Sequence, residues 1–230
     1  MPILLLASSN PGKLREFRAA AAERGVTVDV LPGIAELPGC LEDGITFEEN
    51  ARKKAAHYSR YSPGWVFADD SGLCVDALGG APGVYSARFA GPQATDAQNN
   101  QRLLAQIHGV ESGARVNRIS KFETRDSGPS PHVSSFEFPV SATPCNRAAH
   151  YICVIALAQA GKVLTVVEGR ADGLIIDHPR GTGGFGYDPH FLYPPLGKTF
   201  AEILPREKFA VSHRGAAFRK LLDYLGARGQ

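Results

Sequence analysis

Two adjacent carboxylates follow a short apolar run, and they are the strongest candidates for chemistry in this chain. Residues 66–68 predict a buried strand, and Asp69, Asp70 and Ser71 come directly after it. Ligands bind beyond the carboxyl ends of strands in open α/β sheets, and neighbouring strand residues point to opposite faces. Mg²⁺ prefers one or two carboxylates plus substrate phosphates and water. The pattern therefore predicts a metal-assisted site with different roles for the two acids, or else a turn capped by one of them.

A loop of small residues ends in a lysine and separates an apolar run, residues 3–7, from a helical pattern. The loop consists of Ser8, Ser9, Asn10, Pro11, Gly12 and Lys13. Asn10 suits an N-cap and Pro11 suits the first helical position. The start of a helix offers N–H groups and partial positive charge to a phosphate, and Lys13 adds a full charge. The alternative is a capped helix with a surface lysine.

A glycine-rich segment at residues 181–189 has the composition of a base-binding loop. Phe185 and Tyr187 offer flat faces on which a base could stack, Gly186 allows close approach, and Asp188 could accept hydrogen bonds from ring N–H groups. The alternative is a flexible turn whose aromatic side chains belong to the core.

Three further groups could complete a site for an anionic ligand. Glu42 lies in an acidic turn, Lys208 supplies a cation, and His213 with Arg214 opens a predicted final helix after Ser212. Arg214 could donate to a keto oxygen, while His213 could donate as well or orient Arg214. A solvated loop and ordinary helix capping are the alternatives.

Strands and helices alternate along the chain, which predicts an α/β fold with a partly parallel sheet. Capping boxes at Thr46–Glu49 and Thr95–Gln98 predict two helices, the second ending near Ile107. Further strands are expected at residues 26–31, 151–158, 163–168 and 173–176. We expect one domain over residues 1–230 with a flexible insertion at residues 111–147, which is rich in serine and proline.

The composition excludes several classes of protein. The net charge is +2, so charge gives no reason to expect a nucleic-acid polymer or an anionic membrane as partner. No apolar stretch approaches the roughly 20 residues of a membrane span. The four cysteines form no CxxC pair, so we expect reduced thiols in a cytoplasmic protein without a zinc site.

The motifs together resemble those of the inosine triphosphate pyrophosphatases. SSNPGK, EDGITFEENA, ADDSGL, LGGAPGVYSARFAG, GTGGFGYDP and SHRG occur in the order found in that family. The resemblance covers nearly the whole chain apart from residues 111–147. It implies an elongated α/β fold in which two lobes flank a central nucleotide cleft beside a long, mixed, twisted sheet, and it implies a homodimer.

The resemblance also implies a reaction, the Mg²⁺-dependent cleavage of ITP, dITP and XTP to the monophosphate and pyrophosphate. Residues 8–13 would hold the triphosphate, and Glu42 would bind Mg²⁺. Asp70 would accept a proton from water and contact the metal, with Asp69 as the alternative for either task. The remaining residues implied to bind substrate are Ser71, Phe185, Gly186, Tyr187, Asp188, Lys208, His213 and Arg214.

Two other functions stay open at this point. A nucleotide-binding or regulatory module without hydrolysis would not need the acids at positions 69 and 70. A pyrophosphatase for modified pyrimidine or methylated nucleotides would use another base pocket. Arg214 carries only donors, which favours a 6-keto purine over adenine.

Overall fold

The computed structural model describes residues 3–120 and 146–228 of the chain. Within that part, one sheet holds seven strands in the order β2-β1-β3-β4-β5-β6-β7. Strand β1 is parallel to β2 and β3, and the other pairs are antiparallel. The strands are β1 (Ile3–Leu6), β2 (Thr27–Val30), β3 (Trp65–Val75), β4 (Ala148–Gln159), β5 (Lys162–Ile175), β6 (Phe191–Tyr193) and β7 (Lys198–Thr199). The expected mixed α/β architecture is confirmed.

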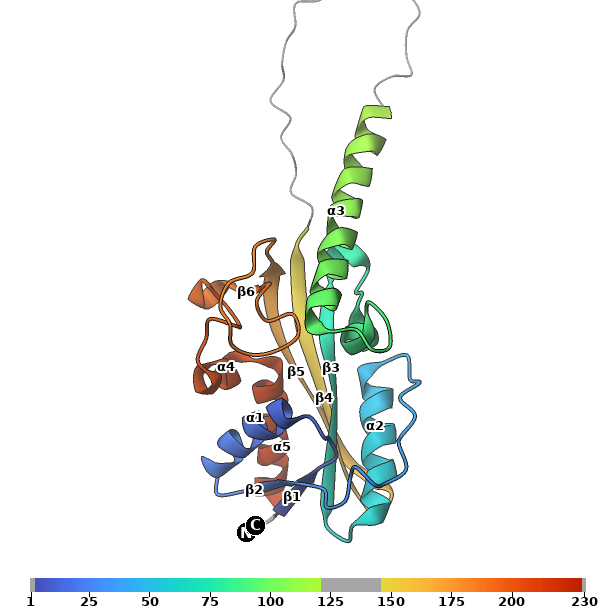
Figure 1. Ribbon diagram of the computed structural model, residues 1–230. Helices are drawn as coiled ribbons and strands as arrows, with labels where there is room; N and C mark the ends of the chain where they lie inside the picture. The colour runs from blue at the N-terminus through green and yellow to red at the C-terminus, as the bar shows by residue number, and fades with distance from the viewer. Residues whose placement is uncertain (1–2, 121–145, 229–230) are drawn as a thin grey trace, which may run out of the picture.

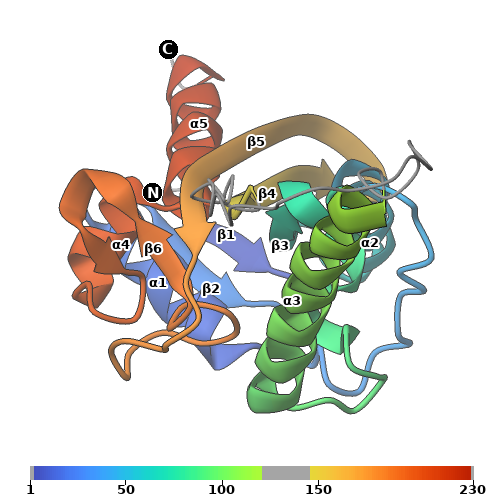
Figure 2. The ribbon, with the colours of Figure 1, turned by 90° about the horizontal axis from the view of Figure 1, so that it is seen from above.

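Helices cover both faces of this sheet (Figures 1 and 2). They are α1 (Pro11–Ala22), α2 (Phe47–Tyr58), α3 (Asp96–Ser120), α4 (Pro205–Val211) and α5 (His213–Arg228). Helices α1, α4 and α5 lie on one side, where Phe17, Phe67 and Phe218 centre an apolar core. Helix α2 packs on the opposite face through Ala51 and Ala55. The long strands β3, β4 and β5 extend along most of the length of the molecule (Figure 1).

The two predicted helix starts near the N-terminus are confirmed. Asn10 caps α1 and Pro11 takes its first position. Thr46 caps α2 by accepting a hydrogen bond from the Glu49 N–H. The carboxylate of Glu49 reaches back to the N–H of Ile45 at 2.8 Å rather than to that of Thr46, so the expected capping box closes one residue earlier.

The prediction that a strand ends just before the acids is wrong. Strand β3 continues to Val75, and Asp69 and Asp70 lie in its middle, opposite Ile155 and Val154 of β4. The antiparallel ladder with β4 keeps these polar residues extended, where the sequence favours a turn. The acids still lie close to the carboxyl end of the neighbouring strand β1, because the pairing of β3 with β1 stops at Phe67, opposite Leu6.

The two short strands expected at residues 163–168 and 173–176 form one strand, β5. Gly169 lies between them and is where α5 approaches the sheet. A Cβ atom at Gly169 would stand 2.1 Å from the backbone oxygen of His213. The glycine therefore marks a close helix–sheet contact and not the end of a strand.

Helix α3 is longer than predicted, because it continues beyond Ile107 to Ser120. Residues 111–120 of the expected insertion are therefore helical, and residues 121–145 lie outside the described residues. Arg147, just before β4, forms an ion pair with Glu111 at 3.0 Å and another with Asp177 at 2.7 Å. These contacts join α3 to the strands beside it. Among the described helices, none is long and apolar enough to cross a membrane.

Candidate active site

The loop after β1 offers one positive group to a ligand. The Asn10 side chain accepts hydrogen bonds from the N–H groups of Gly12 and Lys13 at 2.8 and 3.2 Å, and Ser8 Oγ accepts from the Asn10 N–H. Three N–H groups of the loop that was expected to bind phosphate, those of Asn10, Gly12 and Lys13, are therefore occupied. The exposed loop still directs the Lys13 side chain into the site, where its ammonium lies 2.7 Å from Asp69.

Asp69 is a buried carboxylate at the meeting point of the predicted residues. Besides Lys13, it accepts a hydrogen bond from Ser71 Oγ at 3.2 Å, and Arg214 Nε lies 3.8 Å away. Arg214 also donates to Ser71 Oγ at 3.0 Å. Burial raises the pKa of Asp69, but Lys13 and Arg214 outweigh it and hold the pKa below its usual value. Asp69 therefore stays ionised and joins the loop after β1 to the start of α5.

Asp70 has a different environment and remains partly exposed. Its carboxylate accepts hydrogen bonds from the buried Asn50 side chain at 3.0 Å and from the Ser71 N–H at 3.1 Å. Burial raises the pKa of Asp70, and the hydrogen bond from Asn50 and the charge of Lys54 only partly oppose that rise. A carboxylate with a raised pKa and access to solvent suits a proton acceptor. Only Asp70 of the two acids has these properties.

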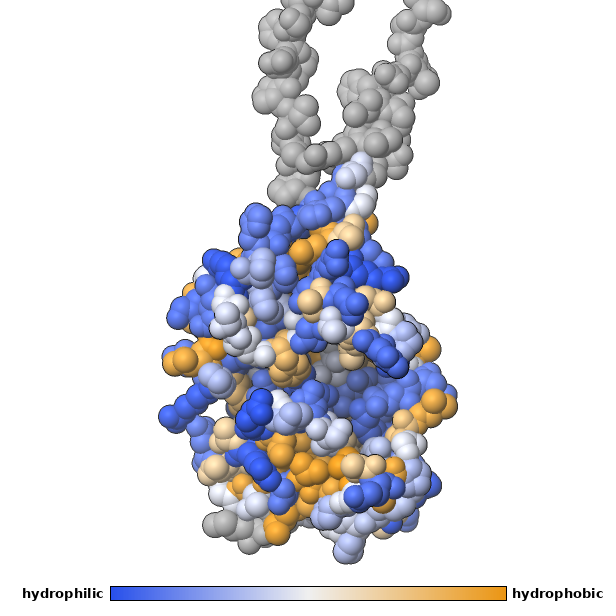
Figure 3. Space-filling model, in the orientation of Figure 1, coloured by the Kyte–Doolittle hydropathy of each residue, from blue (hydrophilic) through white to orange (hydrophobic). Residues whose placement is uncertain are grey.

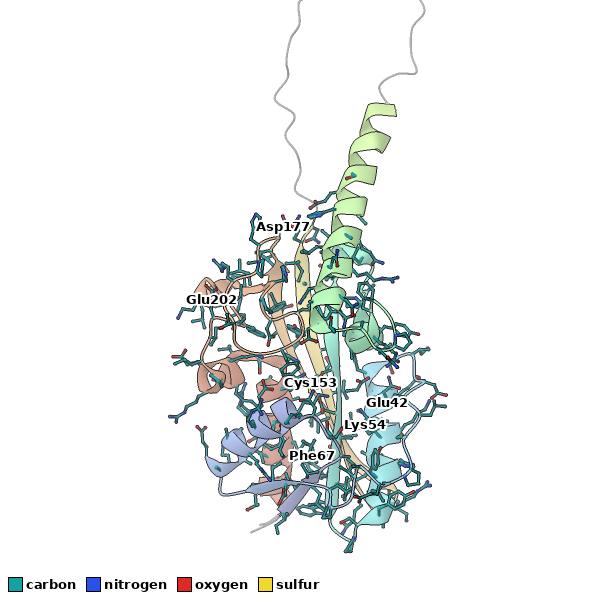
Figure 4. The ribbon with its side chains drawn as sticks, in the orientation of Figure 1. Glu42, Lys54, Phe67, Cys153, Asp177 and Glu202 are labelled. Carbon is teal, nitrogen blue, oxygen red and sulfur yellow. The ribbon has the colours of Figure 1, made fainter. Side chains whose placement is uncertain are left out.

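Glu42 stands beside Lys54 of α2, as Figure 4 shows, and the two form an ion pair at 2.7 Å. Lys54 also donates to the backbone oxygen of Asp69 at 3.4 Å. This half-buried lysine thus connects Glu42 with the strand that carries the acids. Sequence reasoning missed Lys54 and Asn50, although both follow the capping box within one or two helical turns.

The glycine-rich loop places Phe185 against two cations. Lys208 Nζ lies 5.2 Å and Arg214 Cζ 4.8 Å from the centre of the Phe185 ring. Lys208 also donates to Asp188 at 2.6 Å, and Asp188 accepts from the Phe185 N–H at 2.9 Å. Glu16 of α1, another residue missed in the sequence, contacts Lys208 at 3.4 Å and Arg214 at 3.3 Å. The predicted cluster is therefore brought together.

Tyr187 does not offer its face to a ligand as predicted. The side chain is buried among Leu73, Tyr151 and Phe191, and its hydroxyl donates to the Ser86 backbone oxygen at 2.8 Å. Tyr187 is therefore a core residue, as the alternative interpretation of the glycine-rich segment had it. Tyr187 fixes the loop from behind while Phe185 faces the cations.

His213 is buried and stacks on Tyr151, with ring centres 4.6 Å apart. Neither ring nitrogen has a hydrogen-bond partner among the described residues, so His213 does not orient Arg214 through a hydrogen bond as expected. Burial, with added repulsion from Arg214, Lys208 and Lys13, holds the pKa of His213 well below its usual value. His213 is therefore neutral in the folded protein.

Neutral His213 should make the folded state sensitive to acid. Its pKa is lower in the folded than in the unfolded protein, so the unfolded state binds more protons below pH about 6.5. Stability should fall as the pH drops below that value, by at most about 1.4 kcal/mol per pH unit for this one proton. Urea unfolding between pH 5 and 7.5 should show a shallower loss for His213→Phe, which keeps the stacking. Equal slopes for both proteins would contradict this assignment.

A cavity of about 820 Å³ lies between α1, α4, α5 and the glycine-rich loop. Gly12, Glu16, Phe185 and Lys208 line it together with apolar residues of α4 and α5. Glu42 and Asp70 are not part of its lining. We call Phe185 and Lys208, which this cavity borders, the predicted base half of the site, and we call Glu42, Asp69 and Asp70, which lie outside its lining, the polar half. In Figure 3, hydrophilic residues border a hollow near the middle of the visible face.

The carboxylates at the polar half fit a metal that is shared with a ligand. Asp69 has one oxygen, Oδ1, that is buried without a hydrogen-bond partner in the described part of the chain. No cluster of three His, Cys, Asp or Glu side chains suited to a metal occurs within residues 3–120 and 146–228. Mg²⁺ commonly takes only one or two protein carboxylates and completes its shell with water and phosphate oxygens. Glu42 and Asp70, with Asp69 beside them, match that donor set.

Comparisons with known proteins agree with the resemblance in the motifs. The model of the Ham1 family matches residues 4–128 and 133–224. A dITP/XTP pyrophosphatase of Geobacillus kaustophilus is 42% identical, covering 100% of this chain and 99% of the relative. One from Acidobacterium capsulatum is 43% identical and covers 96% and 97%.

Solved structures agree with these sequence matches. The structure of a HAM1 protein from Coxiella burnetii aligns with a TM-score of 0.75 at 34% identity, over 99% of this chain and 100% of that one. A nucleoside-triphosphatase (dITP/XTP pyrophosphatase) from Mycobacterium abscessus aligns with a TM-score of 0.63 at 38% identity, over 96% and 99%. The fold, the ordered motifs and the family match lead to one conclusion: this chain belongs to the Ham1 family.

Proposed function

We propose that the protein hydrolyses deaminated purine nucleoside triphosphates, namely ITP, dITP and XTP, to the monophosphate and pyrophosphate. One observation carries the proposal. The Asp69 carboxylate contacts Lys13, in the loop of residues 8–13 that would hold the triphosphate, and also Arg214, which lies beside Phe185. Asp70, the partly exposed acid with a raised pKa, is the next residue along the strand. The names of the relatives, dITP/XTP pyrophosphatases, support the same reaction.

The proposal includes Mg²⁺ as cofactor. Glu42 and Asp70 would hold the ion, with Asp69 as an adjacent ligand. When bound, the ion would neutralise the charge of the triphosphate and polarise its phosphoryl oxygens. Lys54 pairs with Glu42 in the structure. With the ion bound, Lys54 would either turn toward the phosphates or stay beside Glu42, and in both positions it would be a second cation near the triphosphate.

The residues of the chain divide the chemistry between them. Lys13 and Lys54 would bind the negative triphosphate and oppose the charge that builds up as it is cleaved. A water molecule attacks the α-phosphorus, its proton passes to Asp70, and the bond to the oxygen that leaves with pyrophosphate breaks. Asn50 orients the Asp70 carboxylate through its 3.0 Å hydrogen bond. Hydrolysis of this kind depends on position and charge more than on a covalent intermediate.

The base half of the site would select a 6-keto purine. The base would stack on Phe185 in the cavity next to Lys208 and Glu16. Asp188 holds Lys208 through a 2.6 Å hydrogen bond. Arg214 offers only donors, which suit the keto oxygen of hypoxanthine or xanthine and mismatch the amino group of adenine. Neutral His213 supports Arg214 by filling the space against Tyr151.

We also propose a cytoplasmic homodimer, with no nucleic-acid polymer and no membrane as partner. The net charge of +2 and the free thiols of Cys40, Cys74 and Cys153 support this setting. Residues 1–230 would form one domain, with the insertion expected at residues 111–147 not needed for catalysis.

Product analysis tests the proposed reaction. The protein is incubated with ITP and Mg²⁺, and phosphorus NMR identifies the products. We expect IMP and pyrophosphate in equal amounts, and loss of turnover when EDTA removes the metal. Release of IDP with orthophosphate would show that another bond is cleaved, and undiminished turnover in EDTA would exclude the metal from the reaction.

A further inference from the structure

The first two turns of α3 hold both backbone polar groups of Gly186 in the glycine-rich loop. The Gly186 N–H donates to Asp96 Oδ2 at 2.6 Å, and the Gly186 carbonyl accepts from Asn100 Nδ2 at 3.0 Å. Asp96 and Asn100 are four residues apart, so they project from the same side of the helix. The two side chains therefore hydrogen-bond the backbone of the same residue, which lies 90 positions from Asp96 and 86 positions from Asn100 in the sequence.

Gly186 directly follows Phe185 in the glycine-rich loop. Its φ is +65°, a left-handed conformation that glycine adopts without strain. Phe185 precedes it and is fixed on the other side by its N–H bond to Asp188. Tyr187 follows it and is fixed through its hydroxyl to Ser86. The Asp188 N–H also donates to the Phe185 carbonyl at 3.4 Å, and the contacts from α3 hold the next peptide of the backbone that presents the Phe185 ring.

The start of α3 does not need Asp96 for its own capping. Thr95 Oγ1 accepts from the Gln98 N–H at 3.3 Å, and Gln98 Oε1 accepts from the Thr95 N–H at 2.8 Å. The capping box that the sequence predicts is thus complete without Asp96. The Asp96 carboxylate is therefore free of the capping box and serves the Gly186 N–H as its acceptor.

We propose that Asp96 and Asn100 are positioning residues for the base, holding Gly186 so that Phe185 faces the cavity beside Lys208 and Arg214. This inference rests on the proposed function, since it assigns the loop to a purine base. It adds α3, which carries none of the predicted site residues, to the elements that set base affinity. Asp96 and Asn100 act through Gly186 and do not touch the reacting atoms.

Affinity for ITP, measured by calorimetry in EDTA, tests the inference without turnover. Asp96→Ala and Asn100→Ala should each raise the Kd for ITP by about tenfold, the effect of losing one good contact. Asp96→Asn keeps an acceptor oxygen for the Gly186 N–H and should bind nearly as the wild type does. Gln98→Ala is the matched control, because it weakens the same helix start without touching Gly186.

Hydrogen exchange of the peptide that contains Gly186 gives a second readout that needs no nucleotide. Exchange should become faster in Asp96→Ala, and it should stay near the wild-type rate in Asp96→Asn and Gln98→Ala. In the metal-loaded enzyme, KM should rise in the alanine variants with kcat largely retained, because the acids are undisturbed.

The outcomes separate this inference from the proposed function. An unchanged Kd in both alanine variants would overturn it, as would an equal rise in Gln98→Ala. A loss in Asp96→Asn as large as in Asp96→Ala would show that the charge at the helix start matters and not the bond to Gly186. If the wild type binds ITP without hydrolysing it, the proposed reaction fails, and the Kd values still decide the role of Asp96 and Asn100.

Discussion

Asp70→Asn should lower kcat for ITP by about 10³-fold, because general-base catalysis typically contributes 10² to 10⁴ and the amide cannot accept the proton. The substitution keeps size and shape, and its oxygen can still accept from Asn50. The melting temperature should therefore change little. Steady-state kinetics with Mg²⁺, together with thermal unfolding, measures both effects.

Asp69→Asn is the matched control for the adjacent carboxylate. Asp69 is buried against Lys13 and lies near Arg214, so its neutral variant leaves Lys13 without its ion-pair partner, while Arg214 keeps Glu16. Removing one partner of a buried ion pair costs about 3–5 kcal/mol of stability. Asp69→Asn should therefore unfold at lower temperature, whereas Asp70→Asn should not. Near-normal kcat in Asp70→Asn would show that another group activates the water.

Arg214→Ala should reduce the preference for ITP over ATP by about 100-fold. A site that hydrogen-bonds a particular substrate group discriminates by as much as about 10⁴–10⁵, and removing its donor erodes most of that. The fold should survive, because Lys13 remains with Asp69 and Lys208 remains with Glu16. The ratio of kcat/KM for ITP and ATP measures the effect.

Lys220→Ala provides the control for losing a cation from the same helix. Lys220 lies on α5 and donates to the Glu168 backbone oxygen, away from the cavity. Its variant should keep the wild-type preference for ITP. If the ratio of kcat/KM for ITP over ATP stays high in Arg214→Ala, another donor must bind the 6-keto oxygen, and Lys208 is the next candidate.

Local patterns in the sequence predicted the parts of the site that depend on neighbouring residues. The Asn10 cap and the Pro11 start of α1 follow from preferences within one helical turn. The family resemblance of the motifs assigned Lys13, Arg214 and, as the alternative to Asp70, Asp69 to one site, and their side chains lie together in the structure. The mixed α/β fold followed from the alternation of strands and helices.

Contacts between residues that are far apart in the chain could not be predicted from the sequence patterns. Glu16 meets Arg214 across 198 positions, and no local pattern links the two. The acids were expected at a strand end because residues 69–72 favour a turn, but pairing with β4 overrides that preference. Tyr187 was assigned to the base although it belongs to the core, because an aromatic residue in a glycine-rich loop suits either place. These outcomes depend on tertiary packing.

The most direct test of the central claim is pyrophosphate release from ITP, dITP, XTP, GTP and ATP with Mg²⁺ at matched concentrations. The arrangement of Lys13, Asp70 and Arg214 predicts strong turnover of ITP, dITP and XTP, with little from ATP. Equal turnover of ATP and ITP would contradict the keto-reading role of Arg214. Absence of turnover with every nucleotide would contradict the assignment of this site to hydrolysis.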